Sequence, residues 1–332
     1  MADGFMKAVV IEEYGGPGVV QIRDLPIPVP GPSEVLVKVA AAGVNFMDVH
    51  TRQGKYEHSR TYPVSLPCVL GMEGAGTVVK SGNTVSGIAE GDRVAWCISW
   101  GSYAEYVCVP QSRLARIPEG LSFELAAASL FQGATAHYLV HDVARLSPGS
   151  RCLIHAASGC VGQLLVQMAK RAGAMVIATA GTLEKAAVAR QLGADHALLY
   201  GNGGFVESVR DITGGAGVDV AFDAVGKATL RDTFKCVRKR GLVVNFGSVS
   251  GSISDLDPIE LGEAGSLFLT RPRLADHMQD GEAQRRAEYV FSGLLDGSLR
   301  VEIAERYGMS HVREAHEQLE TRQRIGKAVL VI

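Results

Sequence analysis

The sequence predicts an α/β protein, with a doubly wound parallel sheet in the middle of the chain and a strand-rich part before it. Residues 151–270 alternate six times between short apolar runs and helical patterns. Apolar runs of this kind suit strands that are buried on both faces of a parallel sheet. Residues 6–110 carry short Val-rich runs bounded by Gly or Pro, which are typical of a barrel or sandwich. At about 150 residues per domain, a chain of 332 residues suggests two domains.

The strand-rich part contains five predicted strands and one extended connection. The connection is Pro26–Pro32, whose prolines lack backbone donors and therefore exclude a central strand or a helix. The predicted strands are Met6–Glu12, Glu34–Ala42, Gly76–Ser81, Asp92–Cys97 and Ala104–Pro110.

The middle part contains the strands of the predicted parallel sheet and helices between them. Thr182 is the N-cap candidate of the second helix. The predicted strands are Cys152–His155, Met175–Thr179, His196–Tyr200, Val218–Asp223, Leu242–Phe246 and Ser266–Leu269, and the helices are Val161–Ala172, Thr182–Leu192 and Lys227–Lys239.

The last sixty residues are too few for a core of their own. They contain two helical patterns, Glu282–Leu295 and Val312–Arg322, before an apolar end, Lys327–Ile332. We therefore expect this tail to return to the first part and donate a strand to it, with Lys327 in a structural role.

Composition excludes several classes of protein. Thirty-three basic and 35 acidic residues give a net charge of -2, without a basic block, so nucleic-acid binding has no electrostatic support. No run of 18 apolar residues suits a membrane helix. Met1–Lys7 has an early Asp3 and no hydrophobic segment after it, so we expect no secretory signal. Six cysteines without a Cys-x-x-Cys pair predict reduced thiols and a cytoplasmic location.

A turn after the first predicted parallel strand has the pattern of a phosphate site. Its residues are Ala157, Ser158, Gly159, Cys160, Val161 and Gly162, which is Ala-x-Gly-x-x-Gly. Small residues here allow a pyrophosphate to approach the backbone and the helix to pack on the strand. The helix start then offers amides and the positive end of its dipole. Because the motif follows a strand and opens a helix, it predicts dinucleotide binding.

The end of the next predicted strand favours NADP over NAD. A site for NAD usually places Asp or Glu about 20 residues beyond the glycines, to bind the ribose hydroxyls. Here positions 179–181 are Thr179, Ala180 and Gly181, and Lys185 follows in the first helical turn. A carboxylate that would repel a 2′-phosphate is absent and a cation that would attract it is near, so we expect NADPH.

Four segments then carry a resemblance to a known family. They are Gly43–Asp48 with Arg52 and Gly54, Gly71–Gly76, the phosphate turn, and Gly265–Pro272. Together they resemble the quinone oxidoreductase (zeta-crystallin-like) branch of the medium-chain dehydrogenase/reductase superfamily. The resemblance implies a GroES-like, partly open β-barrel catalytic domain at 1–127 and 273–332, and a Rossmann dinucleotide-binding domain at 128–272. It places cofactor and substrate between the two, and implies a homodimer through the strand 266–270.

The resemblance also implies a protein without zinc. Zinc-dependent relatives use a Cys and a Gly-His-Glu segment as ligands, whereas Asn45 stands at the Cys position and Met72 at the His position. Asn and Met are poor zinc ligands. Without zinc to lower the pKa of an alcohol, reduction of a quinone or an enone is the expected chemistry, since its oxyanion needs only hydrogen-bond donors.

The resemblance implies two groups of site residues. The substrate side comprises Asn45, Asp48, Arg52 and Tyr56, with His50 as a further candidate where relatives often carry Tyr; Asn45 and Tyr56 are candidate hydrogen-bond donors. The cofactor side comprises the turn residues 157–162 together with Gln132, Thr135, Gly181, Lys185, Tyr200, Asn245, Phe246, Gly247, Ser248, Leu269 and Arg322.

Three functions stay open at this point. The first is NADPH-dependent reduction of quinones by hydride transfer. The second is reduction of an α,β-unsaturated carbonyl, such as an enone or an enoyl thioester. The third is a structural NADPH-binding protein without catalysis, as in lens crystallins.

Overall fold

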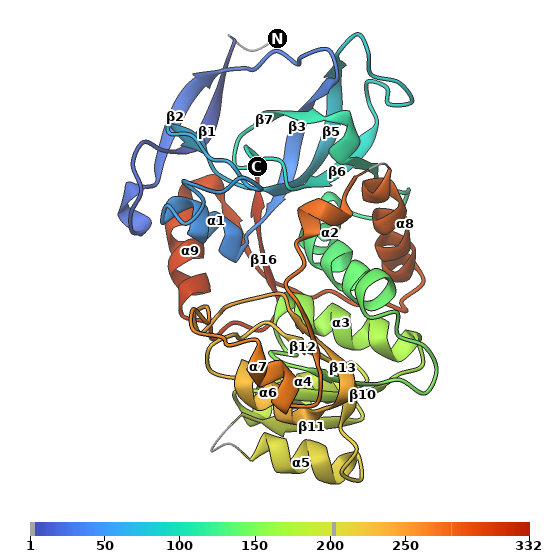
Figure 1. The fold of residues 1–332 in the computed structure, drawn as a ribbon. Coiled ribbons are helices and arrows are strands. Elements are labelled where there is room, and N and C mark those ends of the chain that lie inside the picture. Colours follow the sequence, from blue (N-terminus) through green and yellow to red (C-terminus); the bar gives the residue numbers. More distant parts are fainter. Residues whose placement is uncertain (1–3, 201–203, 280) are drawn as a thin grey trace. The chain divides into compact units, whose positions relative to one another are not determined.

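A computed structural model describes residues 4–200, 204–279 and 281–332 of the chain, so Met1 to Asp3 of the predicted N-terminal segment lie outside it. The described chain divides into two compact units (Figure 1). Unit 1 is 1–134 with 278–332, and unit 2 is 135–277. The predicted domain limits, 127/128 and 272/273, stay a proposal about independently folding parts.

Unit 1 is built mainly from strands. Its described residues contain a seven-stranded sheet, in the order β15-β16-β3-β5-β6-β8 with β7 on β3, and a three-stranded sheet, β2-β1-β4. The strands are β1 Phe5–Ile11, β2 Gln21–Pro26, β3 Glu34–Gly43, β4 Cys68–Val69, β5 Glu73–Ser81, β6 Arg93–Cys97, β7 Tyr106–Pro110, β8 Leu114–Arg116, β15 Ile303–Gly308 and β16 Lys327–Val331.

Helices and 3-10 turns complete unit 1. Helix α2 begins in unit 1 and ends in unit 2. The sequence suggests that Phe131–Thr135 opens a helical stretch, but α2 already begins at Phe123, so this segment lies in the interior of the helix. The helices are α1 Phe46–Arg52, α2 Phe123–Tyr138, α8 Glu282–Leu295 and α9 Val312–Glu320, and the 3-10 turns are η1 Pro17–Val19, η2 Gln111–Arg113 and η6 Met309–His311.

The C-terminal strand joins the large sheet of unit 1, and it packs against the N-terminal strand, which belongs to the three-stranded sheet. Strand β16 pairs antiparallel with β3, so that Leu330 lies opposite Ala42, and Figure 1 shows the red strand beside the blue one. The predicted return of the tail to the first part is therefore confirmed. Val9, Ile11 and Leu330 belong to one buried apolar cluster there, which ties the last strand to the first.

Unit 2 is the predicted doubly wound sheet. Its described strands are all parallel, in the order β11-β10-β9-β12-β13-β14. The elements are η3 Leu139–Val143, β9 Arg151–Ile154, α3 Cys160–Arg171, β10 Met175–Ala180, α4 Leu183–Gln191, β11 His196–Leu199, α5 Phe205–Ile212, β12 Val218–Asp223, α6 Leu230–Cys236, β13 Val237–Asn245, α7 Ile259–Glu263, β14 Phe268–Thr270 and η5 Leu274–His277.

The order in which the strands are connected places the helices of unit 2 on both faces of its sheet. From β9 the chain moves outward to β10 and β11 through α3 and α4, and then returns to β12 and β13 through α5 and α6. Right-handed crossovers in opposite directions lie on opposite faces. Phe205 of α5 and Phe234 of α6 accordingly share one apolar cluster with Ile177.

One predicted helix in unit 2 is wrong at its end. The helix expected at Lys227–Lys239 is α6, Leu230–Cys236, and β13 already begins at Val237. The basic run Arg238–Arg240 resembles the last turn of a helix, but it lies within strand β13. Its flanking residues Val237 and Leu242 pair with β12, and the register shift between them leaves the basic run without a register partner on β12. No helix of the described residues is both long and apolar enough to cross a bilayer.

Candidate active site

The residues predicted for the substrate side lie on or just beyond helix α1. Asn45 directly precedes the helix, and its backbone amide donates to Asp48 Oδ2 at 2.8 Å. Asp48 also accepts from the Met72 amide at 3.1 Å and from the Tyr103 hydroxyl at 3.0 Å. The first turn of α1 is thus fixed to the interior by one carboxylate.

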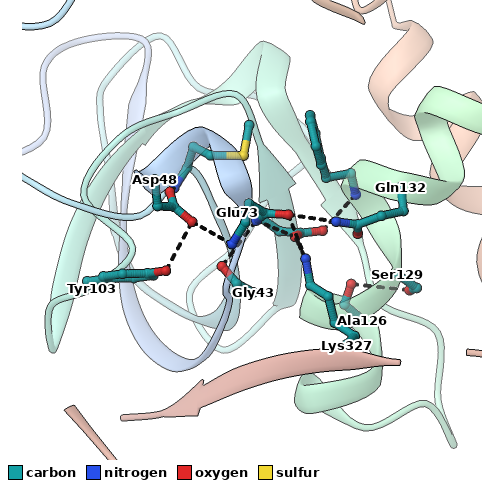
Figure 2. Close-up of polar contacts among 11 residues, drawn as sticks. Gly43, Asp48, Glu73, Tyr103, Ala126, Ser129, Gln132 and Lys327 are labelled. Carbon is teal, nitrogen blue, oxygen red and sulfur yellow. Dashed lines mark hydrogen bonds and ion pairs between the residues drawn. The ribbon is translucent and has the colours of Figure 1, made fainter. Parts of the chain in front are cut away.

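Asn45 and Asp48 belong to a group that we call the buried polar cluster: Asn45, Asp48, Glu73, Tyr103, Gln132 and Lys327. Every member is at most 4% exposed. Figure 2 shows Glu73, Gln132 and Lys327 converging, with the Tyr103 and Asp48 side chains beside them. All six belong to unit 1, although they come from strands, a helix and the tail.

Lys327 and Glu73 form the ionic centre of the buried polar cluster. Lys327 Nζ lies 3.1 Å from Glu73 Oε2 and 2.6 Å from Asn45 Oδ1. Glu73 Oε1 accepts from the Phe131 amide of α2 at 2.7 Å. A Cβ at Gly43 would approach Glu73 Oε2 to 2.3 Å, so glycine at the end of β3 is what allows this close packing.

Both amide hydrogens of Asn45 are used inside this cluster. Its Nδ2 donates to Gly43 O at 3.1 Å and to Glu73 Oε2 at 3.0 Å. The Gln132 carboxamide lies against the same groups: in one orientation its nitrogen donates to Asn45 Oδ1, and in the other its oxygen accepts from Lys327 Nζ, each at 2.6 Å. Asn45 can therefore donate to a substrate only by giving up one of these bonds.

Burial changes the titration of two members. The pKa of Asp48 is raised to about 7, because burial outweighs the hydrogen bonds from Asn45 and Tyr103 and the charge of Lys327. Burial and the nearby Asp48 raise the pKa of Tyr103 well above its usual value.

His50 and Tyr56 lie in a second group, the aromatic cluster, made of His50, Tyr56, Tyr62 and Trp100. All four side chains are partly exposed. The ring of Tyr56 lies 6.1 Å from His50, 5.6 Å from Tyr62 and 6.4 Å from Trp100 between centroids. Burial, followed by the charges of Lys55 and Arg322, lowers the pKa of His50 to about 4, so its imidazole is neutral at neutral pH.

Arg52, the fifth residue of this prediction, lies apart from both clusters. It is fully buried at the end of α1, where its guanidinium forms an ion pair with Glu320 of α9. Arg52 therefore joins two helices and does not pair with Asp48.

The predicted phosphate turn lies between β9 and α3 in unit 2. A Cβ at Gly162 would come within 2.3 Å of Ala156 O, so only glycine allows the helix to start this close to the strand. Gly159 precedes the helix with extended backbone, and the first intrahelical bond runs from the Gln163 amide to Gly159 O at 2.8 Å. The amides of the first turn therefore point out of the helix end, where they favour an anion.

The other predicted cofactor residues of unit 2 lie mostly beyond the carboxyl ends of its strands. Gly181 and Lys185 follow β10, where Thr182 caps α4 by accepting from the Lys185 amide at 3.2 Å. Tyr200 follows β11, and its phenol accepts from the Ala156 amide. Asn245, Phe246, Gly247 and Ser248 end β13 or follow it, and Leu269 is on β14.

Three predicted cofactor residues lie elsewhere. Gln132, as described, belongs to the buried polar cluster. Thr135 is on α2 and is 7% exposed, and Arg322 follows α9, exposed and with a φ of +58°.

Several residues that shape these sites were missed by the sequence analysis. Glu73 is the Glu of Gly-Met-Glu, and Lys327 opens an apolar strand, where a lone charge signals a buried partner. His155 and Asp223 each stand at the last position of a predicted strand, beside the phosphate turn and the next loop. Polar residues at the carboxyl ends of parallel strands are the signal that could have found these two.

The fold defines the class of this protein first. A Rossmann-like parallel sheet joined to a GroES-like unit is an architecture of dehydrogenases and reductases. The family model described as alcohol dehydrogenase GroES-like domain matches residues 31–119, and the one described as zinc-binding dehydrogenase matches residues 160–273. The chain belongs to the medium-chain dehydrogenase/reductase superfamily of oxidoreductases, in the quinone oxidoreductase branch.

Curated relatives and solved structures match over almost the whole chain. A quinone oxidoreductase of Pseudomonas aeruginosa is 37% identical over 98% of this chain and 99% of its own length. A 2-haloacrylate reductase of Burkholderia is 36% identical over 98% of this chain and 99% of its own. The structure of Escherichia coli quinone oxidoreductase complexed with NADPH is 35% identical with a TM-score of 0.93, covering 98% of this chain and all of that one.

The residues at the position of the family's catalytic zinc do not fit that ion. Asn45 and Met72 replace the thiolate and imidazole ligands, and Glu73 is paired with Lys327. The other carboxylate nearby, Asp48, accepts from the backbone amides of Asn45 and Met72. A dication would have to share the site with the Lys327 ammonium, 2.6 Å from Asn45 Oδ1. Among the described residues, no group of three or more His, Cys, Asp or Glu could hold a metal.

Proposed function

We propose that this chain reduces quinones with NADPH, and that it does so without a metal ion. The observation that carries the proposal is the Lys327–Glu73 pair, which fills the place of the zinc ligands with a buried ammonium. When bound, NADPH supplies a hydride from its nicotinamide ring. A site without a Lewis acid to activate an alcohol suits acceptors that already take up hydride, and quinones are such acceptors.

The residues of unit 2 fit a dinucleotide with a 2′-phosphate. Gly162 keeps the helix start of α3 close to the strand, which is the usual arrangement at a pyrophosphate. Thr179, Ala180 and Gly181 supply no carboxylate at the end of β10, and Lys185 lies in the next helical turn. The Escherichia coli relative with NADPH bound supports the same cofactor here.

The aromatic cluster supports a flat, conjugated substrate. Tyr62 and Trp100 are partly exposed and lie 5.6 Å and 6.4 Å from the ring of Tyr56 between centroids, and rings of this kind stack on planar π-systems. The neutral His50 and the Tyr56 phenol can each donate a hydrogen bond to the oxygen that becomes negative after hydride arrives. The Tyr56 phenol oxygen also lies 3.5 Å from His50 Nδ1, while both amide hydrogens of Asn45 are used inside the buried polar cluster. The proton can come from solvent or from such a hydroxyl.

A second candidate function is reduction of an α,β-unsaturated carbonyl. The observation that favours it is the 2-haloacrylate reductase relative, whose identity and coverage are similar to those of the quinone oxidoreductases. Both reactions need the same hydride and the same stabilised oxyanion. They differ in what the substrate side must accommodate, which is a flat ring in one case and a small acrylate or a thioester in the other.

The experiment that tests this function follows NADPH absorbance with the purified chain and two substrate panels. One panel holds benzoquinones and naphthoquinones, and the other holds enones, 2-chloroacrylate and an enoyl thioester. Turnover with the quinone panel at higher kcat/KM supports the proposal. Turnover with the second panel alone would replace quinone reduction by the alternative, and NADPH binding without any turnover would favour the structural NADPH-binding protein.

Three further features are proposed with this function. We propose a cytoplasmic location, because the six cysteines are free. Burial, with a smaller effect of nearby charges, raises the pKa of five of these thiols. We propose a homodimer through the strand 266–270, whose core is the edge strand β14. We also propose the predicted domain limits as folding units, which limited proteolysis would test.

A further inference from the structure

The segment that opens the phosphate turn contains a strained residue. Ala156 has a φ of +51°, in the left-handed region that residues with a Cβ rarely adopt. Two bonds of its own hold this conformation: its carbonyl accepts from the Gly159 amide at 2.9 Å, and its amide donates to the phenol oxygen of Tyr200. Because position 156 is alanine and not glycine, neighbouring groups must stabilise the strained backbone conformation.

Tyr200 reaches the turn from the end of β11 and is well anchored there. Its backbone amide donates to Ala180 O at 3.1 Å, at the end of the adjacent strand. The nearby Thr179 hydroxyl lowers the pKa of this phenol, against the larger effect of burial. Burial raises the pKa of Tyr200 to about 12, so the phenol keeps its hydrogen at neutral pH.

A buried chain of hydrogen bonds continues from Thr179 to Asp223. The Thr179 hydroxyl lies 2.7 Å from His155 Nδ1, and His155 Nε2 lies 2.9 Å from the Thr233 hydroxyl. Thr233 in turn lies 3.2 Å from Asp223 Oδ2. Thr179, His155, Thr233 and Asp223 are all fully buried. Thr179, His155 and Asp223 lie at or just beyond the carboxyl ends of their strands, and Thr233 is on helix α6.

Donors and acceptors along this chain can be assigned so that every hydrogen has an acceptor. The Asp223 carboxylate accepts from the Val225 and Gly226 amides and from Thr229, so Thr233 must also donate toward it or to Thr229 O. His155 is neutral, since burial lowers its pKa to about 4, and it therefore donates from Nε2 to Thr233 and accepts at Nδ1 from Thr179. At the other end, the Tyr200 phenol oxygen, near Thr179, is the acceptor for the Ala156 amide.

We propose that Tyr200 is a positioning residue for the phosphate turn: its phenol oxygen, oriented through Thr179 by His155, Thr233 and Asp223, binds the Ala156 amide and keeps the turn in its left-handed form. This role differs from a contact between Tyr200 and a 2′-phosphate, because it acts on any dinucleotide that uses the turn. In that respect it rests on the proposed function, which places the cofactor pyrophosphate there. The five side chains then form one unit that sets the shape of the turn before the cofactor arrives.

The test compares Tyr200→Phe with the double variant Tyr200→Phe, Ala156→Gly. Tyr200→Phe keeps the ring and removes the acceptor of the Ala156 amide. Glycine adopts a φ of +51° without strain, so a glycine at position 156 does not need the hydrogen bond to Tyr200 to keep this conformation. We expect the double variant to recover what the single variant loses, whereas a lost contact to the cofactor itself would not be recovered. Tyr106→Phe, in unit 1, is the matched control.

Two readouts separate the proposal from its alternatives. In the cofactor-free chain, hydrogen exchange of the Ala156 amide becomes about tenfold faster in Tyr200→Phe than in the wild type or the control. Measured by quenching of protein fluorescence, the affinities for NADPH and NADH fall by the same factor, about tenfold, and both return in the double variant. A fall for NADPH alone would instead assign Tyr200 to the 2′-phosphate and overturn the positioning role.

A second variant keeps the test decisive if Tyr200→Phe does not fold. Thr179→Val removes the hydroxyl that orients the phenol, and it also accelerates exchange at Ala156 if the chain of bonds acts as proposed. Unchanged exchange in a folded Tyr200→Phe or Thr179→Val variant would overturn the proposal. If the wild type binds neither coenzyme, the proposed function fails. The exchange measurement still shows whether Tyr200 holds the Ala156 amide.

Discussion

At the scale of single residues, the Lys327–Glu73 pair stands out because neither charge has access to water. Lys327 is 2% exposed and Glu73 is not exposed at all. Each charge is satisfied by the other and by amide groups of Asn45, Gln132 and the backbone of Phe131. Removing one partner of such a pair leaves a buried charge without compensation, which costs much more than the pair itself contributes.

The first prediction concerns this pair. Lys327→Met lowers the free energy of unfolding by about 3–5 kcal/mol, because the Glu73 carboxylate stays behind unpaired. Lys327→Met combined with Glu73→Gln costs clearly less than the sum of the two single variants. Urea unfolding followed by circular dichroism measures all four proteins. If the losses of unfolding free energy in the two single variants add up to that of the double variant, the two charges do not interact.

The second prediction concerns the choice of cofactor. Lys185→Ala weakens NADPH binding by about tenfold and leaves NADH binding nearly unchanged, because one cation beside a 2′-phosphate contributes on the order of 1–2 kcal/mol. Fluorescence titration with the two coenzymes measures both affinities. Arg190→Ala, a cation in the last turn of the same helix, is the control. Equal affinity of the wild type for NADPH and NADH would contradict the preference itself.

Part of the candidate site could be predicted from the sequence, but the two charged residues that hold it in place could not. Asn45, Asp48 and Gln132 were predicted, and the structure brings them together in the buried polar cluster. Glu73 and Lys327, which hold these residues, are 254 positions apart in the chain and meet only because β16 returns beside β3. Contacts over such separations follow from tertiary packing and leave no local pattern in the sequence.

At the scale of elements, helix α1 serves two purposes in its seven residues. Its first turn carries Asp48 into the buried polar cluster, and its last residue, Arg52, forms an ion pair with Glu320 of α9. His316 of α9 is fully buried nearby and lies 6.0 Å from the Tyr103 ring. The packing of α1 on α9 therefore places a histidine beside a buried guanidinium.

Elements with a clear apolar pattern could be predicted, and those held by a partner strand could not. The Val-rich strands β1, β3 and β12 match their predicted ranges closely. Strand β15 was not predicted because Ile303–Gly308 has no fully buried position, although it alternates between partly buried and exposed residues. Its pairing with β16 supplies the hydrogen bonds that its own side chains do not predict.

The third prediction concerns the pH dependence of stability through His316. Burial and the charge of Arg52 lower the pKa of His316 to about 3. The unfolded chain binds this proton at a pH near 6.5, so the free energy of unfolding falls as pH decreases from about 6.5 toward 3. His316→Phe removes this contribution. Neither ring nitrogen has a hydrogen-bond partner among the described residues, so the change costs little at pH 8.

Urea unfolding at pH 8 and pH 5 measures this effect. We expect the wild type to lose about 2 kcal/mol more than His316→Phe between the two conditions. His58→Asn, at a side chain that is 91% exposed, is the matched control and should keep the wild-type slope. Parallel profiles for His316→Phe and the wild type would show that His316 is protonated in the folded chain.

At the scale of the whole molecule, the parallel sheet of unit 2 ends in a strand with an open edge. Strand β14 pairs with β13 on one side and is the last strand of the sheet in the described chain. Its Phe268 is 63% exposed, which is unusual for an aromatic residue on an edge strand. Unpaired edges with apolar side chains favour pairing with another chain. In the proposed homodimer, a second copy of β14 would pair with the backbone edge and cover Phe268.

The fourth prediction follows from this edge. Phe268→Glu places two like charges against each other in a symmetric contact, and it also removes apolar area, so the protein shifts from two chains to one. Sedimentation velocity or light scattering over a range of concentrations measures the mass. Val29→Glu, at an apolar residue that is 79% exposed in unit 1, is the control and should keep the wild-type mass. A wild type with the mass of a single chain at all concentrations would refute the dimer, and a dimeric Phe268→Glu variant would place the interface elsewhere.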